Sequence, residues 1–115
     1  MLRDVEVWLW DELKAAEAIE DFMGKAQADE FAANDFLMSA VERKFEIIGE
    51  ALNNYSKVDP EGATNIAGLS EIVAFRNRII HGYRHLDPHR VCQIAKSKLP
   101  RLKLQLSAAL AGLVP

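Results

Sequence analysis

Apolar residues recur every three or four positions along almost the whole chain, and this spacing constrains the fold more than any other feature of the sequence. One apolar stripe runs through residues 4–23, and a longer one through residues 34–55. A stripe with this period marks one face of an α-helix, whereas a half-buried strand alternates every second residue. No segment alternates in that way, and no internal repeat or low-complexity stretch is present. The sequence therefore predicts an all-α protein.

Glycine and serine indicate where the helices begin, end or approach one another. Gly24 follows the first stripe and is a usual residue for a helix C-terminal cap. Gly49 lies inside the second helix, where it costs roughly 1 kcal/mol relative to alanine, which favours close approach by another helix at this point. Residues 56–68 are expected to form a loop with room for one helical turn. Ser70 is the expected N-cap of a third helix, which should end at Gly82.

Two prolines shape the expected fourth helix. Asp87-Pro88 is a start signal, because an acidic N-cap is followed by proline at the first helical position. Pro100 removes a backbone donor farther along, so the helix should either kink or restart there. Four or five helices of these lengths predict an antiparallel bundle.

The 115 residues fit a single domain, and half of them are hydrophobic. A single core of this size is only marginally stable, so burial against a second copy would help. No run of about 18 apolar residues could span a membrane, and acidic residues stand near the N-terminus, where a secretory signal carries bases. Cys92 is the lone cysteine and cannot form an intrachain disulfide. We therefore expect one cytoplasmic domain over residues 1–115.

Charge is distributed unevenly between the two parts of the chain. Residues 1–62 carry 15 acids and 6 bases, a net charge of −9, whereas residues 63–115 carry 2 acids and 8 bases, a net charge of +6. An anionic partner such as a nucleic acid would be attracted to the second part. Pairing of acidic and basic helices inside one fold would explain the same asymmetry.

The stretch from Phe75 to Tyr83 holds the residues best suited to catalysis. Asn77 and His81 are four residues apart and share a helix face, whereas Arg76 lies about 140° from His81 if the helix stays regular. We expect the helix to fray at Gly82, which would let His81 swing toward Arg76. Arginine grips a phosphate by bidentate hydrogen bonds, and histidine moves protons near neutral pH. Together they suit phosphodiester cleavage, with His81 assisting attack by a ribose 2′-hydroxyl and Arg76 stabilising the transition-state charge. On spacing alone, both side chains could equally satisfy the carbonyls at a helix end.

The spacing Arg76-x4-His81-x-Tyr83 resembles the R-x4-6-H signature of HEPN domains, in the form found in HepT-like toxins. The segment Val41–Ala51, which ends in Ile-Ile-Gly-Glu-Ala, resembles the second-helix segment of the same family. The closing helix, with its Leu-Pro step, is also similar, so the resemblance covers nearly the whole chain. One departure is Cys92, where relatives often carry a tryptophan, and this affects packing more than chemistry.

This resemblance implies a single HEPN helical domain that acts as a metal-independent endoribonuclease and needs no cofactor. It implies that Arg76 and His81 form the catalytic pair and that Asn77 positions them. It also implies a homodimer in which the motifs of two chains face one cleft. From the neighbouring helix, Glu50 could orient Arg76, although a supporting salt bridge or a solvated face would explain Glu50 as well.

The resemblance further implies a toxin of a type VII-like toxin–antitoxin pair. Its partner would be a small nucleotidyltransferase antitoxin of the MNT type, which attaches AMP to the motif tyrosine and forms a higher assembly with the toxin. Tyr83 matches that tyrosine. AMP would place bulk and negative charge beside Arg76 and so block the phosphate of RNA. We expect Arg78 and Arg84 to lie on a positive rim that holds RNA, unless they are ordinary solvated surface.

Two other interpretations remain open. The chain could be a non-catalytic helical subunit that binds nucleotide or substrate for a two-component nucleotidyltransferase, or it could be a purely structural bundle. The RNase and the binding subunit differ at His81, because only the RNase would lose an activity when this residue is substituted.

Three histidines at four-residue intervals raise the question of a metal site. His81, His85 and His89 would share one face of a continuous helix. Gly82 and Asp87-Pro88 interrupt such a helix, and no cysteine or ordered carboxylate completes a ligand set. We therefore expect no metal site.

Overall fold

The computed structural model describes residues 2–81 and 87–113, and every regular element within these ranges is a helix. No β-strand occurs in this part of the chain, which confirms the all-α prediction. Four of the helices are long, and two consist of about one turn. They are α1 (Leu2–Met23), α2 (Ala28–Ala32), α3 (Asp35–Val58), α4 (Pro60–Ala63), α5 (Leu69–Ile80) and α6 (Pro88–Leu113).

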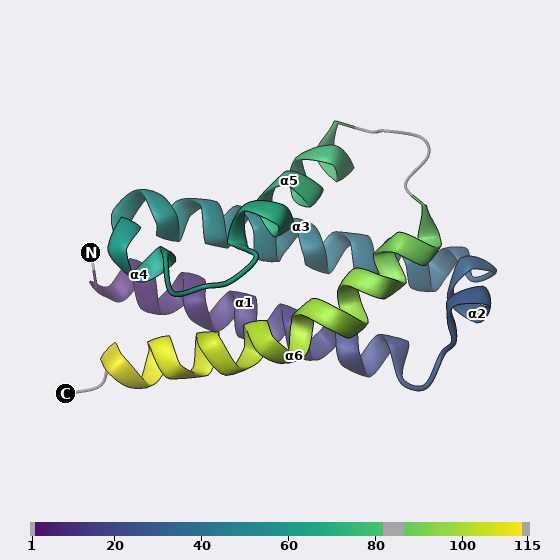
Figure 1. Ribbon diagram of the computed structural model, residues 1–115, viewed down its shortest axis with the longest axis horizontal. Helices are drawn as coiled ribbons and strands as arrows, with labels where there is room; N and C mark the ends of the chain where they lie inside the picture. The colour runs from purple at the N-terminus through teal and green to yellow at the C-terminus, as the bar shows by residue number, and fades with distance from the viewer. Residues whose placement is uncertain (1, 82–86, 114–115) are drawn as a thin grey trace.

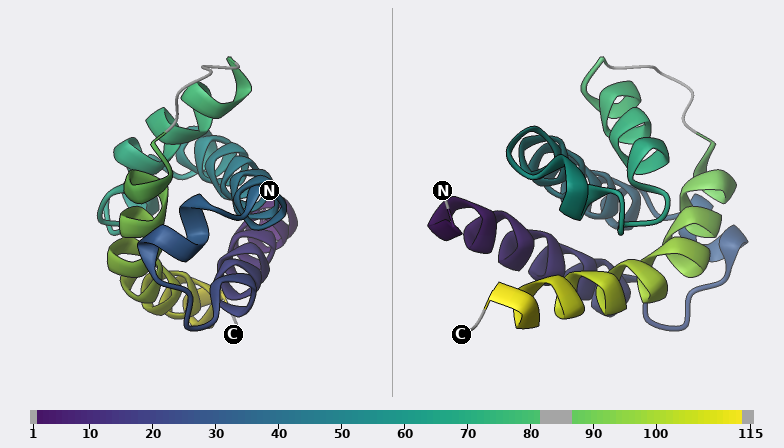
Figure 2. Two further views of the ribbon diagram at one scale, coloured as in Figure 1. Left: turned by 90° about the vertical axis from the view of Figure 1, so that its right-hand side faces the viewer. Right: turned by 60° about the vertical axis from the view of Figure 1, so that its left-hand side comes forward.

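Three long helices lie side by side along the longest dimension of the molecule, which measures 45 Å against 28 and 19 Å in the other directions (Figure 1). α1 packs against both α3 and α6 and runs in the opposite direction to each. α5 packs chiefly on α3 and rises away from α1 (Figures 1 and 2). The antiparallel bundle expected from the sequence is therefore present, with α5 as its outlying helix.

The core consists of the apolar faces that the helical periodicity indicated. Phe75 of α5 joins this core by stacking on Phe45 of α3, with ring centroids 5.1 Å apart and ring planes at 21°. An offset aromatic pair adds about 0.5–1.5 kcal/mol to the stabilisation from burial alone, so it helps to hold α5 on α3. The largest fully buried apolar side chains of the long helices are Leu9, Ile19, Val41, Phe45, Ile48, Leu52, Val91, Leu99, Leu102 and Leu106.

Two helix ends follow their sequence signals closely. α1 ends at Met23, and Gly24 adopts a φ of +51°, the left-handed conformation in which glycine closes a helix. α6 begins at Pro88, and Oδ1 of Asp87 accepts a hydrogen bond from the backbone N–H of His89 at 3.0 Å. The predicted end of the first helix and the predicted start of the last are thus confirmed.

The start of α5 differs from the prediction. The helix begins directly after Gly68, and Ser70 already lies inside its first turn. Gly68 has a φ of +77°, a conformation that only glycine adopts readily, so the chain enters the helix before it reaches the serine. α5 ends at Ile80 with His81 as its C-cap, and the predicted end at Gly82 lies outside the described residues.

The connection between α1 and α3 contains a short helix that the periodicity did not reveal. The backbone N–H of Gln27 donates to Oε1 of Glu30 at 3.1 Å and closes the first turn of α2. Phe31 is fully buried and holds α2 against α6 and α3. In the later connection, residues 56–68, α3 continues to Val58, and the single helical turn that was expected there is α4.

α6 continues through Pro100 without interruption, so a restart at this residue is excluded. The axis of α6 bends between its two halves (Figures 1 and 2), as expected of a helix with an internal proline. Leu99 and Leu102 are fully buried on either side of the proline, and their packing offsets the lost backbone hydrogen bond. Within the described ranges, no helix is long and apolar enough to cross a membrane.

Candidate functional site

A close contact between α3 and α5 positions the first residue of the candidate site. A Cβ atom added at Gly49 would lie 2.3 Å from Cβ of Arg76 and 2.7 Å from its Cγ. Any side chain at residue 49 would therefore displace Arg76 or the helix that carries it. The close helix approach inferred from the glycine is confirmed, and it occurs at the arginine of the motif.

The guanidinium of Arg76 is half-buried and is oriented by its neighbour. Nη1 of Arg76 donates to Oδ1 of Asn77 at 3.0 Å. Nε of Arg76 is buried and has no acceptor in the described part of the chain, and no described carboxylate forms an ion pair with this arginine. Because buried donors are nearly always paired, the unmet N–H is an unusual feature of this part of the fold.

His81 lies at the exposed end of α5. Its backbone N–H donates to the carbonyl oxygen of Asn77 at 3.1 Å. The backbone of His81 is still helical, with a φ of −80° and a ψ of 0°. Because α5 stays regular to this point, residues 76 and 81 leave the helix axis in directions about 140° apart. A single copy of α5 therefore presents the arginine and the histidine on different faces, as the spacing indicated.

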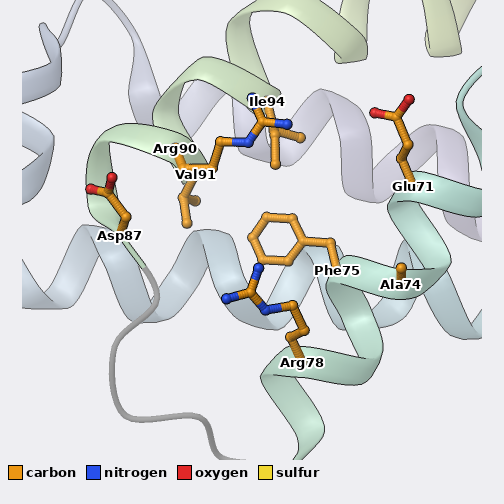
Figure 3. Close-up of a pocket in the computed structure, with 8 residues that line it drawn as sticks. All are labelled: Glu71, Ala74, Phe75, Arg78, Asp87, Arg90, Val91 and Ile94. Carbon is orange, nitrogen blue, oxygen red and sulfur yellow. The ribbon is translucent and has the colours of Figure 1, made fainter.

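The other candidates occupy separate parts of the surface. Arg78 is exposed on the side of α5 that faces α6 and lines a groove of about 400 Å³ (Figure 3). Glu50 is exposed on α3 and lines a depression beside α1. The structure shows no ion pair between Glu50 and Arg76, so a supporting role for Glu50 stays a prediction. Tyr83 and Arg84 lie outside the described residues.

His89 belongs to an exposed cluster at the start of α6. Its Nε2 lies 3.0 Å from Oδ1 of Asp29, and its Nδ1 lies 3.4 Å from Oδ1 of Asp87. The hydrogen bond with Asp29 is the main cause that raises the pKa of His89, and the contacts with Asp87 act in the same direction. In the ranges that the structure describes, no three histidine, cysteine or carboxylate side chains gather as a metal site would require.

The sequence reasoning missed a buried acid on α1. Glu12 has no exposed surface, and neither carboxylate oxygen has a hydrogen-bond partner among the described residues. Burial raises the pKa of Glu12 to about 9, with a smaller contribution from the charge of Asp11. Its position was a usable signal, because Glu12 lies three residues after Leu9 and four before Ala16 on the apolar face.

Comparison with known proteins gives a consistent result along the chain. The family model described as "Ribonuclease HepT-like" matches residues 13–109. A "Putative RNase" of Methanocaldococcus jannaschii is 33% identical over 104 residues, which cover 90% of this chain and 94% of the relative. A second "Putative RNase" of that organism is 32% identical over 101 residues, 88% of this chain and 83% of the relative.

A third relative comes from another archaeon. The "Probable ribonuclease HepT" of Thermococcus cleftensis is 30% identical over 107 residues, which cover 90% of this chain and 93% of the relative. No solved structure matches the chain.

Proposed function

The chain belongs to the HepT-like ribonuclease family, and on that premise we propose that it is a metal-independent endoribonuclease with Arg76 and His81 as its catalytic pair. The observation that carries this proposal is the environment of Arg76. Asn77 orients the guanidinium through a 3.0 Å hydrogen bond, and no described carboxylate neutralises it. An oriented arginine without an acidic partner is suited to hold a phosphate.

The proposed chemistry is transesterification at an RNA phosphodiester. The ribose 2′-oxygen forms a bond to phosphorus and the bond to the 5′-oxygen breaks, which leaves a 2′,3′-cyclic phosphate and a 5′-hydroxyl. His81 carries one of the two proton transfers, from the 2′-hydroxyl or to the leaving 5′-oxygen, and water carries the other. Arg76 stabilises the charge that builds up on the phosphate oxygens. One histidine, one arginine and water thus account for the protons and the charge of the proposed step, which needs no metal ion.

The active form in this proposal is a homodimer in which both motifs face one cleft, and each arginine acts with the histidine of the other chain. One α5 directs its arginine and its histidine about 140° apart, so one copy alone does not aim both at one phosphate. Ile80 lies between these two directions on the helix surface and is 47% exposed, so an apolar side chain is available there to contact a second copy. Two copies that meet at α5 would bring Arg76 of one chain to His81 of the other.

Mixed dimers test the composite arrangement. A dimer of one Arg76→Ala chain and one His81→Ala chain retains a single site with both residues intact. Co-expression of the two inactive chains should therefore restore RNA cleavage to about half of the wild-type level per mixed dimer. If each chain cuts RNA by itself, the mixture stays inactive and the composite site is refuted.

We extend the proposal to a biological role as the toxin of a toxin–antitoxin pair. A nucleotidyltransferase antitoxin would attach AMP to Tyr83, which lies two residues after His81. The added phosphate would repel the RNA phosphate and occupy space beside the catalytic pair. Induced expression of the wild type should arrest growth and fragment RNA, whereas His81→Ala should do neither.

The intact mass of the chain tests the role of Tyr83. After co-expression with a nucleotidyltransferase encoded beside it, the mass should rise by one or more AMP groups, and Tyr83→Phe should abolish the increase. An unchanged mass, or an increase that persists in Tyr83→Phe, would exclude control at this tyrosine. Growth arrest without RNA fragments would contradict the ribonuclease instead.

A further inference from the structure

The groove between α5 and α6 adjoins the candidate active site but is not part of it. α5 packs on α3, and its opposite side faces the first half of α6 across a space of about 400 Å³. This volume falls within the roughly 300–1,000 Å³ of small-molecule sites. Arg78 lines the groove and stands three residues before His81, so the two residues leave α5 about 60° apart. A ligand in the groove would therefore lie on the His81 side of the candidate site.

The floor of the groove is apolar and partly aromatic. Phe75, Val91 and Ile94 line it, and Figure 3 shows the ring of Phe75 between the two helices. The ring is held in place because it stacks on Phe45 of α3. A fixed aromatic ring with aliphatic neighbours suits a flat, largely apolar group such as a nucleobase.

The walls of the groove supply positive charge from both sides. Figure 3 shows Arg78 extending from α5 and Arg90 from α6, with the ring of Phe75 between their guanidinium groups. Arg90 donates to Oε1 of Gln93 at 2.9 Å, and this partner is neutral. Neither arginine forms an ion pair with a carboxylate that the structure describes.

The two acids at the edge of the groove contact other basic residues. Oε2 of Glu71 lies 3.2 Å from Nζ of Lys98. Asp87 caps α6 and lies 3.4 Å from Nδ1 of His89. The charge of the two arginines thus stays available to an anion, and a phosphate accepts hydrogen bonds from guanidinium groups in the geometry that arginine offers.

We propose that this groove holds one unstacked nucleotide of a single-stranded RNA substrate, next to the nucleotide that is cut. The base packs over Ile94 and the small exposed part of Phe75, and Arg78 and Arg90 hold the phosphate. A base inside a duplex is paired and stacked and cannot enter the groove. The inference rests on the proposed ribonuclease function and deepens it, because it makes the enzyme specific for single strands.

Binding of a short RNA to the His81→Ala protein tests the groove without cleavage. The probe is a fluorescently labelled eight-nucleotide single strand, and its affinity is measured by anisotropy at fixed salt. Arg90→Ala should weaken binding by roughly tenfold or more, as the loss of a charge-assisted hydrogen bond implies. Arg101→Ala is the matched control, because this exposed arginine of α6 lies outside the groove and its loss removes the same charge.

Two further probes distinguish binding of a nucleotide in the groove from nonspecific electrostatic attraction of RNA to the positively charged surface. The same strand annealed to its complement should bind more weakly than the single strand. An abasic nucleotide should reduce affinity at one position of the strand and have little effect elsewhere. Equal losses in Arg90→Ala and Arg101→Ala, equal affinity for the duplex, or a change of oligomeric state in Arg90→Ala would each overturn the proposal.

Cleavage kinetics of the protein with His81 intact distinguish a failure of the groove proposal from a failure of the ribonuclease function. In the intact enzyme, Arg90→Ala should raise KM for a single-stranded RNA and leave kcat within about threefold of the wild type. If the wild type cuts RNA and the groove variants bind as before, the groove is wrong and the ribonuclease stands. If the wild type neither cuts nor binds RNA, both fail together.

Discussion

Glu12 makes the stability of this fold fall as the pH rises. Burial raises the pKa of its carboxyl from an ordinary value near 4.5 to about 9 in the folded chain. Between these two values the folded state holds one proton more than the unfolded state. The free energy of unfolding therefore decreases by about 1.4 kcal/mol for each unit of pH. From pH 5 to pH 8 the loss amounts to about 4 kcal/mol, a large part of the roughly 5–15 kcal/mol that stabilises a typical domain.

Glu12→Gln isolates this effect because glutamine has nearly the same shape and does not ionise. We expect the variant to match the wild type near pH 4.5 and to exceed its stability by about 3 kcal/mol at pH 7. Urea unfolding followed by helical circular dichroism at several pH values measures both. Glu6→Gln is the matched control, because this exposed residue lies on the same helix and the substitution removes the same charge.

The change in the free energy of unfolding with pH, compared among the three proteins, tests whether Glu12 is neutral in the folded state. The wild type and Glu6→Gln should lose stability with pH in parallel, whereas Glu12→Gln should lose much less. If the slope of Glu12→Gln equals that of the wild type, Glu12 is already ionised in the folded protein. Its neutral, buried state would then be refuted, and the packing of α1 against the core would need revision at this residue.

Two further substitutions test the packing of α5 and the start of α6. Gly49→Ala should lower the free energy of unfolding by about 1–2 kcal/mol, because overpacking against Arg76 outweighs the gain in helix propensity. It should also slow RNA cleavage, because the added methyl group displaces Arg76. Gly112→Ala adds a Cβ that meets nothing within 4 Å and also gains helix propensity, so it should lower neither the stability nor the rate of cleavage. An equal loss in both variants would refute the contact. Asp29→Asn should lower the pKa of His89 in an NMR titration, because their hydrogen bond is the main cause that raises it. The stabilisation from charged His89 is present at low pH and is lost as the pH rises through its folded pKa, so an unchanged titration in Asp29→Asn would exclude the ion pair.

Local signals explain how much of the fold was predictable. Gly24 closes α1 through its own backbone conformation, and Asp87 caps α6 through the N–H of His89, two residues away. Both signals are local and could therefore be read from the sequence. The start of α5 was misplaced because both Gly68 and Ser70 are competent caps, and only the path of the preceding chain chooses between them. α2 was missed because its five residues are too few to show a helical period.

Long-range packing explains what the sequence did not reveal about the site. The residue types and spacing of Arg76, Asn77 and His81 were readable, and so was the need for close approach at Gly49. That Gly49 meets Arg76 depends on how α5 crosses α3, which no local signal specifies. The α5–α6 groove likewise exists because α5 rises away from the bundle, so no local signal placed Arg90 across from Arg78.

Cleavage of RNA by the purified chain is the most direct test of the central claim. Wild type and His81→Ala are incubated with a single-stranded RNA in EDTA, and the products are separated at single-nucleotide resolution and examined for their ends. We expect the wild type to give fragments with 2′,3′-cyclic phosphate and 5′-hydroxyl ends, and His81→Ala to leave the RNA intact. No cleavage by the folded, unmodified wild type, or equal cleavage by both proteins, would contradict the ribonuclease built on Arg76 and His81.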